Sequence, residues 1–185
     1  MSDILKTGME QKDLVQLLYN SLGEQYYPIS SFSDIGGATL GAVGSSTPTG
    51  LDFNETTDEA ADINIMFPKN IDVTKAISVY VRWSSAGTAA TDVVWDIDYI
   101  ARALGEDVGV AVSNVSVTDT DSTTADALME SPVITIPADT LAGNTESLFL
   151  SLRRDADTTG GDTLASDATV FGIRVGWEIT PLVVV

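Results

Sequence analysis

Cysteine and histidine are both absent from this chain of 185 residues. Without cysteine the chain can form neither a disulfide nor a thiolate metal site. Without histidine it lacks the side chain that most often acts as a general base near neutral pH and most often ligates metals. The two absences argue against an enzyme that relies on an activated nucleophile, and we expect no cofactor and no bound metal.

Basic residues are scarce, with 9 Lys and Arg against 27 Asp and Glu and a formal net charge of -18. Such a chain is repelled by nucleic-acid phosphates and by anionic membranes, so we expect neither as a partner. The charge either keeps the protein soluble or forms a docking surface for a basic partner.

Long apolar runs are also missing, since none reaches the roughly 18 residues of a membrane-spanning helix. The start, Met1 to Met9, carries Asp3 and has no apolar core of a secretory signal. We therefore expect a soluble protein.

The first 60 residues predict an N-terminal arm. Leucines recur at helical spacing over residues 9–22, and Gly23 is a plausible stop. A glycine-rich stretch, 36–50, then predicts an extended connector. We expect the apolar stripe of this short helix to bind a partner surface, either on its own domain or on a neighbouring subunit. The stripe consists of Leu14, Leu17, Leu18 and Leu22.

The second region, 61–185, alternates apolar and polar residues with a period of two, which predicts strands with one buried face. Seven or eight such strands with little helix between them indicate an all-β fold, an antiparallel β-sandwich of jelly-roll type that carries the N-terminal helix and extended arm. The expected inward residues include Ile63, Ile65, Phe67, Ile77, Val79, Val81, Trp83, Val93, Trp95, Ile97, Tyr99, Leu148, Leu150, Leu152, Phe171, Ile173, Val175, Trp177 and Ile179. One or two further strands are indicated by Val108, Val110, Val112, Val115 and Val117.

Paired carboxylates are the first candidate for chemistry. Asp96 and Asp98 share one face of a predicted strand, about 7 Å apart along it. Glycoside hydrolysis uses two carboxylates at about 5 to 9.5 Å. In a chain this acidic, a solvated sheet face balanced by Arg82 is the preferred interpretation.

Calcium is the second candidate. Asp155, Asp157 and Asp162 lie in a glycine-containing loop, and Asp119 and Asp121 form a smaller cluster. The loop is not an EF-hand, because Ser166 stands where the twelfth-position glutamate would be. Acidic turns are common without metal, so we expect no metal site.

Aromatic residues could mark a sugar site. Trp83, Trp95 and Trp177 all lie on predicted inward faces, so we expect them in the core rather than on a stacking platform. Tyr26, Tyr27 and Tyr80 are freer, but they form no recognisable site in the sequence. The chain has no nucleophile elbow and no phosphate-binding loop.

The region from about 62 to 180 resembles jelly-roll structural proteins of tailed viruses. The segments that carry the resemblance are Val79–Trp83, Val93–Tyr99, Ile134–Ala138, Leu148–Asp155 and Asp167–Val175. The resemblance implies a capsid decoration (cement) protein, or the base or shaft of a head or tail fibre, and such proteins are commonly trimers. It supplies no catalytic residues.

We therefore expect a virion structural protein, most simply a capsid decoration protein that bridges capsid subunits and stabilises the particle. It would be a homo-oligomer, a trimer by resemblance, with the major capsid protein or another virion protein as partner. It would lie on the capsid surface or a fibre after assembly in the host cytoplasm. The apolar end, Leu182–Val185, supports association. The alternatives are a fibre or adsorption module that binds host glycan through sandwich loops, another interaction module of the same fold, or an enzyme acting on glycans.

Overall fold

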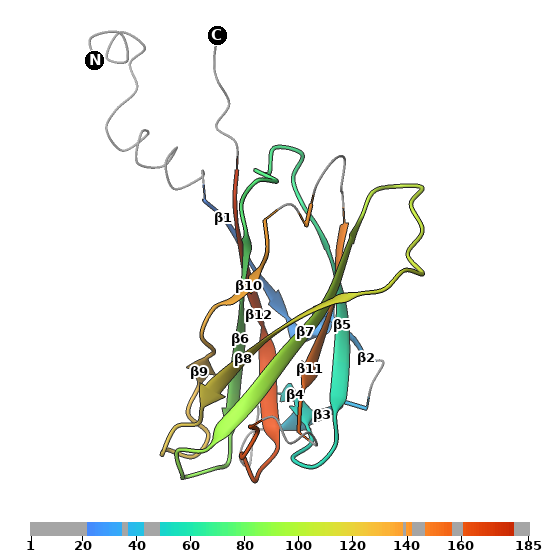
Figure 1. The fold of residues 1–185 in the computed structure, drawn as a ribbon. Coiled ribbons are helices and arrows are strands. Elements are labelled where there is room, and N and C mark those ends of the chain that lie inside the picture. The colour runs from blue at the N-terminus through green and yellow to red at the C-terminus, as the bar shows by residue number, and fades with distance from the viewer. Residues whose placement is uncertain are drawn as a thin grey trace, which may run out of the picture.

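A computed structural model of the chain shows two antiparallel β-sheets packed face to face (Figure 1). Within the described part, the helical content is one short 3-10 turn, η2 (Ile29–Ser31), and no helix is long and apolar enough to cross a membrane. The structure describes residues 22–34, 37–42, 49–138, 140–141, 147–156 and 161–179.

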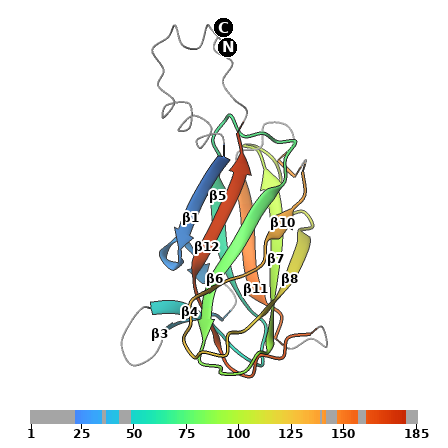
Figure 2. The same ribbon diagram turned by 90° about the vertical axis from the view of Figure 1, so that its left-hand side faces the viewer.

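The larger sheet, sheet A, has seven strands in the path β10-β6-β12-β4-β3, with β1 also pairing β12 and β9 also pairing β6. Figure 2 shows this sheet from its outer side. Its strands are β1 (Leu22–Pro28), β3 (Thr39–Ala42), β4 (Thr49–Phe53), β6 (Ile77–Ser85), β9 (Met129–Glu130), β10 (Ile134–Ile136) and β12 (Ala168–Glu178).

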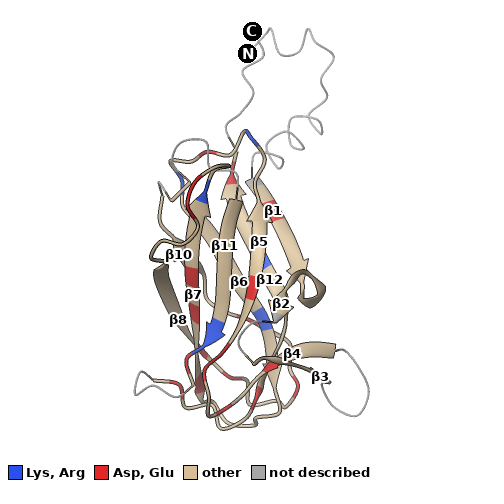
Figure 3. Cartoon of the chain, turned by 90° about the vertical axis from the view of Figure 1, so that its right-hand side faces the viewer, with Lys and Arg blue, Asp and Glu red and all other residues tan. Residues whose placement is uncertain are grey.

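The smaller sheet, sheet B, has five strands in the order β2-β5-β11-β7-β8. It faces the viewer in Figure 3, where acidic segments of β5 and β7 lie on either side of β11. Its strands are β2 (Ser33–Asp34), β5 (Glu59–Met66), β7 (Asp92–Arg102), β8 (Ser113–Thr120) and β11 (Ser147–Arg154).

The core fills the space between the sheets, and period-two alternation places it there. On β6, Ile77, Val79, Val81 and Trp83 are fully buried while the residues between them face outward. Trp95 lies at the centre, with edge-to-face contacts to Phe53 at 5.6 Å and to Trp83 at 5.8 Å. Burying large apolar side chains of this kind is the main driving force of the fold, at about 1.5–3 kcal/mol each.

A buried arginine, Arg154, links the two sheets through hydrogen bonds. The guanidinium of Arg154, at the end of β11, forms a two-bond ion pair with the carboxylate of Asp162 at 2.9 and 3.0 Å. Its other N–H groups donate to the carbonyl oxygens of Phe53, Leu164 and Ser166. All five donors are thereby used, and Phe53 belongs to sheet A, so Arg154 links both sheets to the 161–167 segment.

The N-terminal prediction needs correction. Residues 9–21, including Leu14, Leu17 and Leu18, lie outside the described residues, and Leu22 is the first residue of a strand rather than the end of a helix. Residues before 60 take part in the sandwich, because β1 pairs with β12 over seven residues and Phe53 is fully buried, while the boundary expected at residue 60 stays a prediction. The glycine-rich stretch, predicted to be an extended connector, contains β3 and the start of β4. These two strands pair through their backbones although the composition is typical of a flexible segment.

The prediction of an all-β antiparallel sandwich is confirmed. The strands expected at β5, β6, β7, β10, β11 and β12 form, and the expected residues face inward except where the alternation of buried and exposed residues shifts locally. Val108, Val110 and Val112 instead lie exposed in the long loop between β7 and β8. In β12 an irregularity between Val170 and Gly172 shifts the register, so Val170 is fully buried while Phe171 is not.

Candidate functional site

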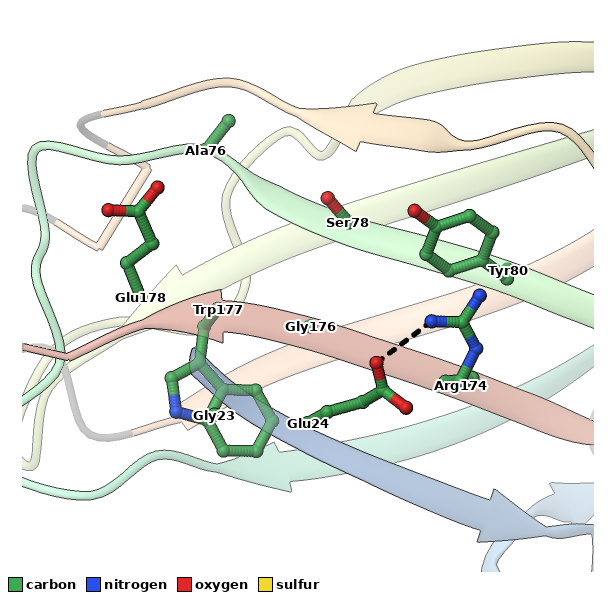
Figure 4. Close-up of a pocket in the computed structure, with 9 residues that line it drawn as sticks. All are labelled: Gly23, Glu24, Ala76, Ser78, Tyr80, Arg174, Gly176, Trp177 and Glu178. Carbon is green, nitrogen blue, oxygen red and sulfur yellow. Dashed lines mark hydrogen bonds and ion pairs between the residues drawn. The ribbon is translucent and has the colours of Figure 1, made fainter. Parts of the chain in front are cut away.

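Two depressions lie on opposite outer faces of the sandwich. The sheet A pocket has a volume of about 210 Å³, and the sheet B groove has a volume of about 480 Å³. The pocket is lined by Gly23, Glu24, Ala76, Ser78, Tyr80, Arg174, Gly176, Trp177 and Glu178 (Figure 4).

The pocket exists because its floor is built from small residues. Glu24, Gly176 and Ser78 stand side by side on β1, β12 and β6. Gly23 is required next to them, since a Cβ there would lie 2.0 Å from Nε1 of Trp177. Gly176 is different, because a Cβ there would make only ordinary contacts, the nearest 3.8 Å away on Ser78. A larger side chain at 176 would therefore enter the pocket.

Tyr80 and Arg174 form one wall of the pocket. The Arg174 guanidinium carbon lies 3.8 Å from the centroid of the Tyr80 ring, in cation–π contact. Its Nη1 donates to the Glu24 carboxylate at 2.9 Å, and its Nη2 donates to Glu130. Figure 4 shows Glu178 near the other end of the pocket, beside Ala76. The pocket thus combines an aromatic ring with carboxylates at both ends.

A second aromatic–arginine pair adjoins the pocket. Arg82 lies 5.1 Å from the Tyr26 ring centroid and donates from Nε to Glu130 at 3.0 Å. The Tyr26 hydroxyl donates to the carbonyl oxygen of Phe171 at 2.9 Å. Gly172 has φ of +151°, and a Cβ there would lie 2.3 Å from the Tyr27 carbonyl oxygen and 2.8 Å from the Tyr26 hydroxyl. Glycine at 172 therefore lets Tyr26 lie across the strand.

We call Tyr26, Tyr80, Arg82, Arg174, Glu24 and Glu130 the Tyr–Arg cluster. Within it, the hydrogen bond from Arg174 lowers the pKa of Glu130, and the bond from Arg82 acts in the same direction. The same bond to Glu130 raises the pKa of Arg174, and burial raises the pKa of Tyr26. Near neutral pH Arg174 is therefore charged and Tyr26 keeps its proton, and carboxylates hold both arginines in ion pairs. This face is a fixed surface suited to binding.

The sheet B groove lies over β5, β11 and β7, under the loop 103–112. Phe149 of β11 stands between Asn64 and Ile100 in one cross-strand row. In the next row Ser151 stands between Asp62 and Asp98. Val108 and Val112 of the loop complete the groove. Its lining is mainly apolar, with two carboxylates along one row.

Asp96 and Asp98, the carboxylate pair considered in the sequence, both have partners within sheet B. Asp96 accepts a 2.7 Å ion pair from Arg153 on the neighbouring strand, and Asp98 accepts a 2.8 Å hydrogen bond from Asn114. The expected balance by Arg82 is wrong, because Arg82 belongs to the other sheet and pairs with Glu130.

Three of the five calcium candidates use their carboxylates in hydrogen bonds within the protein. Asp162 pairs with Arg154, Asp119 accepts from Trp83 Nε1 at 2.8 Å, and Asp121 accepts from the Ser85 hydroxyl at 2.6 Å. Burial raises the pKa of Asp119. Asp157 lies outside the described residues. Among the residues that the structure describes, no three acidic side chains gather as a metal site would require.

The tryptophan prediction holds for Trp83 and Trp95, which are fully buried. Trp177 is partly buried at the end of the core, edge-to-face with Phe67 at 5.2 Å, and it borders the pocket. The Tyr–Arg cluster escaped the sequence analysis because Tyr26 and Glu24 come from a strand that was not predicted. The available signal was the alternation of Tyr80 with Arg82 and of Arg174 with Gly176 on the polar faces of two predicted strands.

No protein-family model matches the chain, and neither does any curated protein. Among solved structures, the chain is similar to a family 35 carbohydrate binding module from Clostridium thermocellum, with a TM-score of 0.51 and 10% identity over 83% of this chain and 97% of that chain. It is also similar to the CBM22-1 xylan-binding domain of Paenibacillus barcinonensis Xyn10C, with a TM-score of 0.48 and 8% identity over 84% and 94% of the two chains. At 10% identity the likeness to the family 35 module shows the fold alone.

Proposed function

We propose that this chain is a non-catalytic carbohydrate-binding module and that the sheet A pocket is its sugar site. The observation that carries the proposal is the arrangement of the Tyr80 ring, the Glu24 and Glu178 carboxylates and a floor of small residues in one pocket. The fold that this chain shares with a carbohydrate binding module supports the same function.

The pocket offers contacts for both the apolar C–H face and the polar hydroxyl groups of a sugar ring. The C–H face of a sugar packs on aromatic rings, and its hydroxyl rim needs oriented polar groups in a mostly preformed site. Arg174 covers one face of the Tyr80 ring, and Tyr80 itself lines the pocket, where we propose that it contacts the ligand. Carboxylates accept strong hydrogen bonds from hydroxyl groups, and the pocket has one near each end.

The charge state of the pocket favours a neutral glycan. Arg174 is already paired with Glu24 and Glu130, so it has little attraction left for an acidic sugar. Glu178 adds another negative charge at the opposite end, with a 3.8 Å ion pair to Lys75 that is exposed to solvent. We propose that the module binds without reacting, because both pocket carboxylates are engaged in ion pairs, Glu24 with Arg174 and Glu178 with Lys75.

The test is calorimetric titration with neutral oligosaccharides of xylose, glucose and galactose against the chain and its Gly176→Val variant. Valine fits the strand backbone and fills the pocket, so we expect affinity to fall roughly tenfold or more with no loss of folding. Asn64→Ala, on the opposite sheet, is the matched control and should bind like the parent. Equal affinity of the parent and Gly176→Val would contradict the pocket assignment, and no binding of any neutral or acidic glycan would contradict the function.

A second candidate is the virion structural protein expected from the resemblance, mounted on a particle by one end. Leu22 pairs with Glu178, so the chain enters and leaves the sandwich at the same end (Figure 1). This arrangement suits attachment through the segments outside 22–179. In this proposal the leucines of 9–22 bind the partner, the chain forms a trimer, and the partner is a capsid protein. Co-sedimentation with purified particles tests it. A chain without residues 1–21 should lose sedimentation but keep sugar binding, and no sedimentation of the parent chain would contradict this candidate.

A further inference from the structure

We propose that the sheet B groove docks an extended segment of a basic partner protein, with an apolar side chain on Phe149 and a Lys or Arg side chain between Asp62 and Asp98. This site is separate from the sugar pocket and does not depend on it.

The apolar half of the groove is open to solvent. Phe149 is 36% exposed at its centre, and Val108 and Val112 of the overhanging loop are 62% and 55% exposed. Exposed apolar side chains that line one groove indicate a binding surface more strongly than the same residues scattered singly.

The loop that carries these valines is held in place from within. Arg102, at the end of β7, donates from Nε to the Asp107 carbonyl oxygen at 2.7 Å. The Glu106 carboxylate accepts from the Ala103 amide at 2.9 Å, and the Asp107 carboxylate accepts from the Gly109 amide at 2.8 Å. A groove with a preformed wall costs less ordering when a partner binds.

The carboxylates in the neighbouring row are not held in ion pairs. Among the described residues, neither Asp62 nor Asp98 forms an ion pair, and no Lys or Arg lines the groove. Arg153, in the next row, forms its ion pair with Asp96 at 2.7 Å, and its charge also interacts with Asp98. The groove therefore offers negative charge to a ligand that brings its own positive charge.

The spacing of the two rows defines the partner segment. Phe149 and Ser151 are two residues apart on β11, so their rows are separated by about 7 Å. In an extended segment, residues i and i+2 point to the same side at the same spacing, so an apolar residue and a basic residue at these positions match the two rows. A second copy of this chain fits this groove poorly, because the groove calls for a basic segment and the chain has a formal net charge of -18.

The test uses fluorescein-labelled peptides and anisotropy. A valine–serine–lysine–serine repeat places valine and lysine on one side, and we expect saturable binding that weakens with added salt. The same repeat with glutamate for lysine, and the repeat with serine for valine, should each bind roughly tenfold more weakly or worse.

Variants locate the binding. The Asp62→Asn/Asp98→Asn double variant keeps hydrogen-bonding groups and should weaken the lysine peptide roughly tenfold, as should Phe149→Ser. The double variant Glu55→Gln/Asp126→Asn is the matched control, because it removes two exposed charges outside the groove and should bind like the parent. Circular dichroism confirms folding of each. Equal weakening by the control pair, equal binding of the glutamate peptide, or no binding of the lysine peptide would overturn the proposal.

Discussion

The two outer faces of this sandwich use charge in opposite ways. On sheet A, each arginine of the Tyr–Arg cluster lies on a tyrosine ring and is paired with glutamate. On sheet B, Phe149 is exposed, and the nearby Asp62 and Asp98 form no ion pair among the described residues. A face whose charges are internally paired can select ligands by shape and hydroxyl geometry, while a face with unpaired carboxylates selects by charge. The fold can therefore present two independent binding surfaces.

The largest expected effect comes from removing residues 1–60, which deletes β1, β3 and β4 from sheet A. Without β1 the pocket loses Glu24, and without β4 the core loses Phe53. We expect this variant to be unfolded by circular dichroism and thermal melting, with both faces lost. Removal of residues 1–21 alone, which leaves every described strand intact, should give a cooperative melt. A cooperative melt of the 61–185 chain would show instead that the remaining strands of both sheets fold without β1, β2, β3 and β4.

Two adjacent arginines of β11 allow a buried ion pair to be compared with a partly exposed one on the sheet B face. Arg154→Met leaves Asp162 buried without its cation, and we expect the free energy of unfolding to fall by about 3–5 kcal/mol. Arg153→Met breaks the partly exposed pair with Asp96 and should cost about 1 kcal/mol or less. Urea denaturation measures both. Equal losses would mean that Arg154 is not the link between the sheets.

The glycines of the sheet A pocket give a matched pair of small changes. Gly23→Ala forces Trp177 to move, and we expect a loss of about 1–3 kcal/mol with a change in tryptophan emission. Gly176→Ala has room for its methyl group and should leave emission and stability nearly unchanged. Peptide binding at the sheet B groove should be intact in both. Weaker peptide binding in the Gly23→Ala variant would show that the two faces are coupled.

Much of the sandwich was predictable because its central strands alternate strictly, as in Ile77 to Trp83. The first strand was missed because Gly23, Glu24 and Gln25 carry no apolar alternation, and its stability comes from pairing with β12. The valines at 108–112 look like a strand in sequence, but their loop is held by side-chain bonds from Arg102 and Glu106. The partnership of Arg154 with Asp162 and the Phe53 carbonyl depends on tertiary packing that no local pattern encodes.

The smallest expected effect is a pH dependence of the sheet A face. Because the folded-state pKa of Glu130 is lowered, its ion pairs stabilise the fold above the ordinary glutamate value of about 4.5. This contribution is lost as the pH falls through the lowered folded pKa. Thermal melts of the parent and Glu130→Gln should differ at pH 7 and converge near pH 3. A difference that grows toward acid would contradict the assigned pairing with Arg174 and Arg82.

Chemical-shift mapping by NMR tests most directly the claim that the faces bind different ligands. A neutral oligosaccharide should shift the amide signals of Glu24, Ser78, Tyr80 and Gly176 and leave the sheet B groove unchanged. The valine–serine–lysine–serine peptide should shift Asp62, Asp98 and Phe149 and leave the pocket unchanged, with each ligand binding equally well in the presence of the other. Overlapping shifts, competition between the ligands, or sugar-induced shifts confined to sheet B would contradict the account.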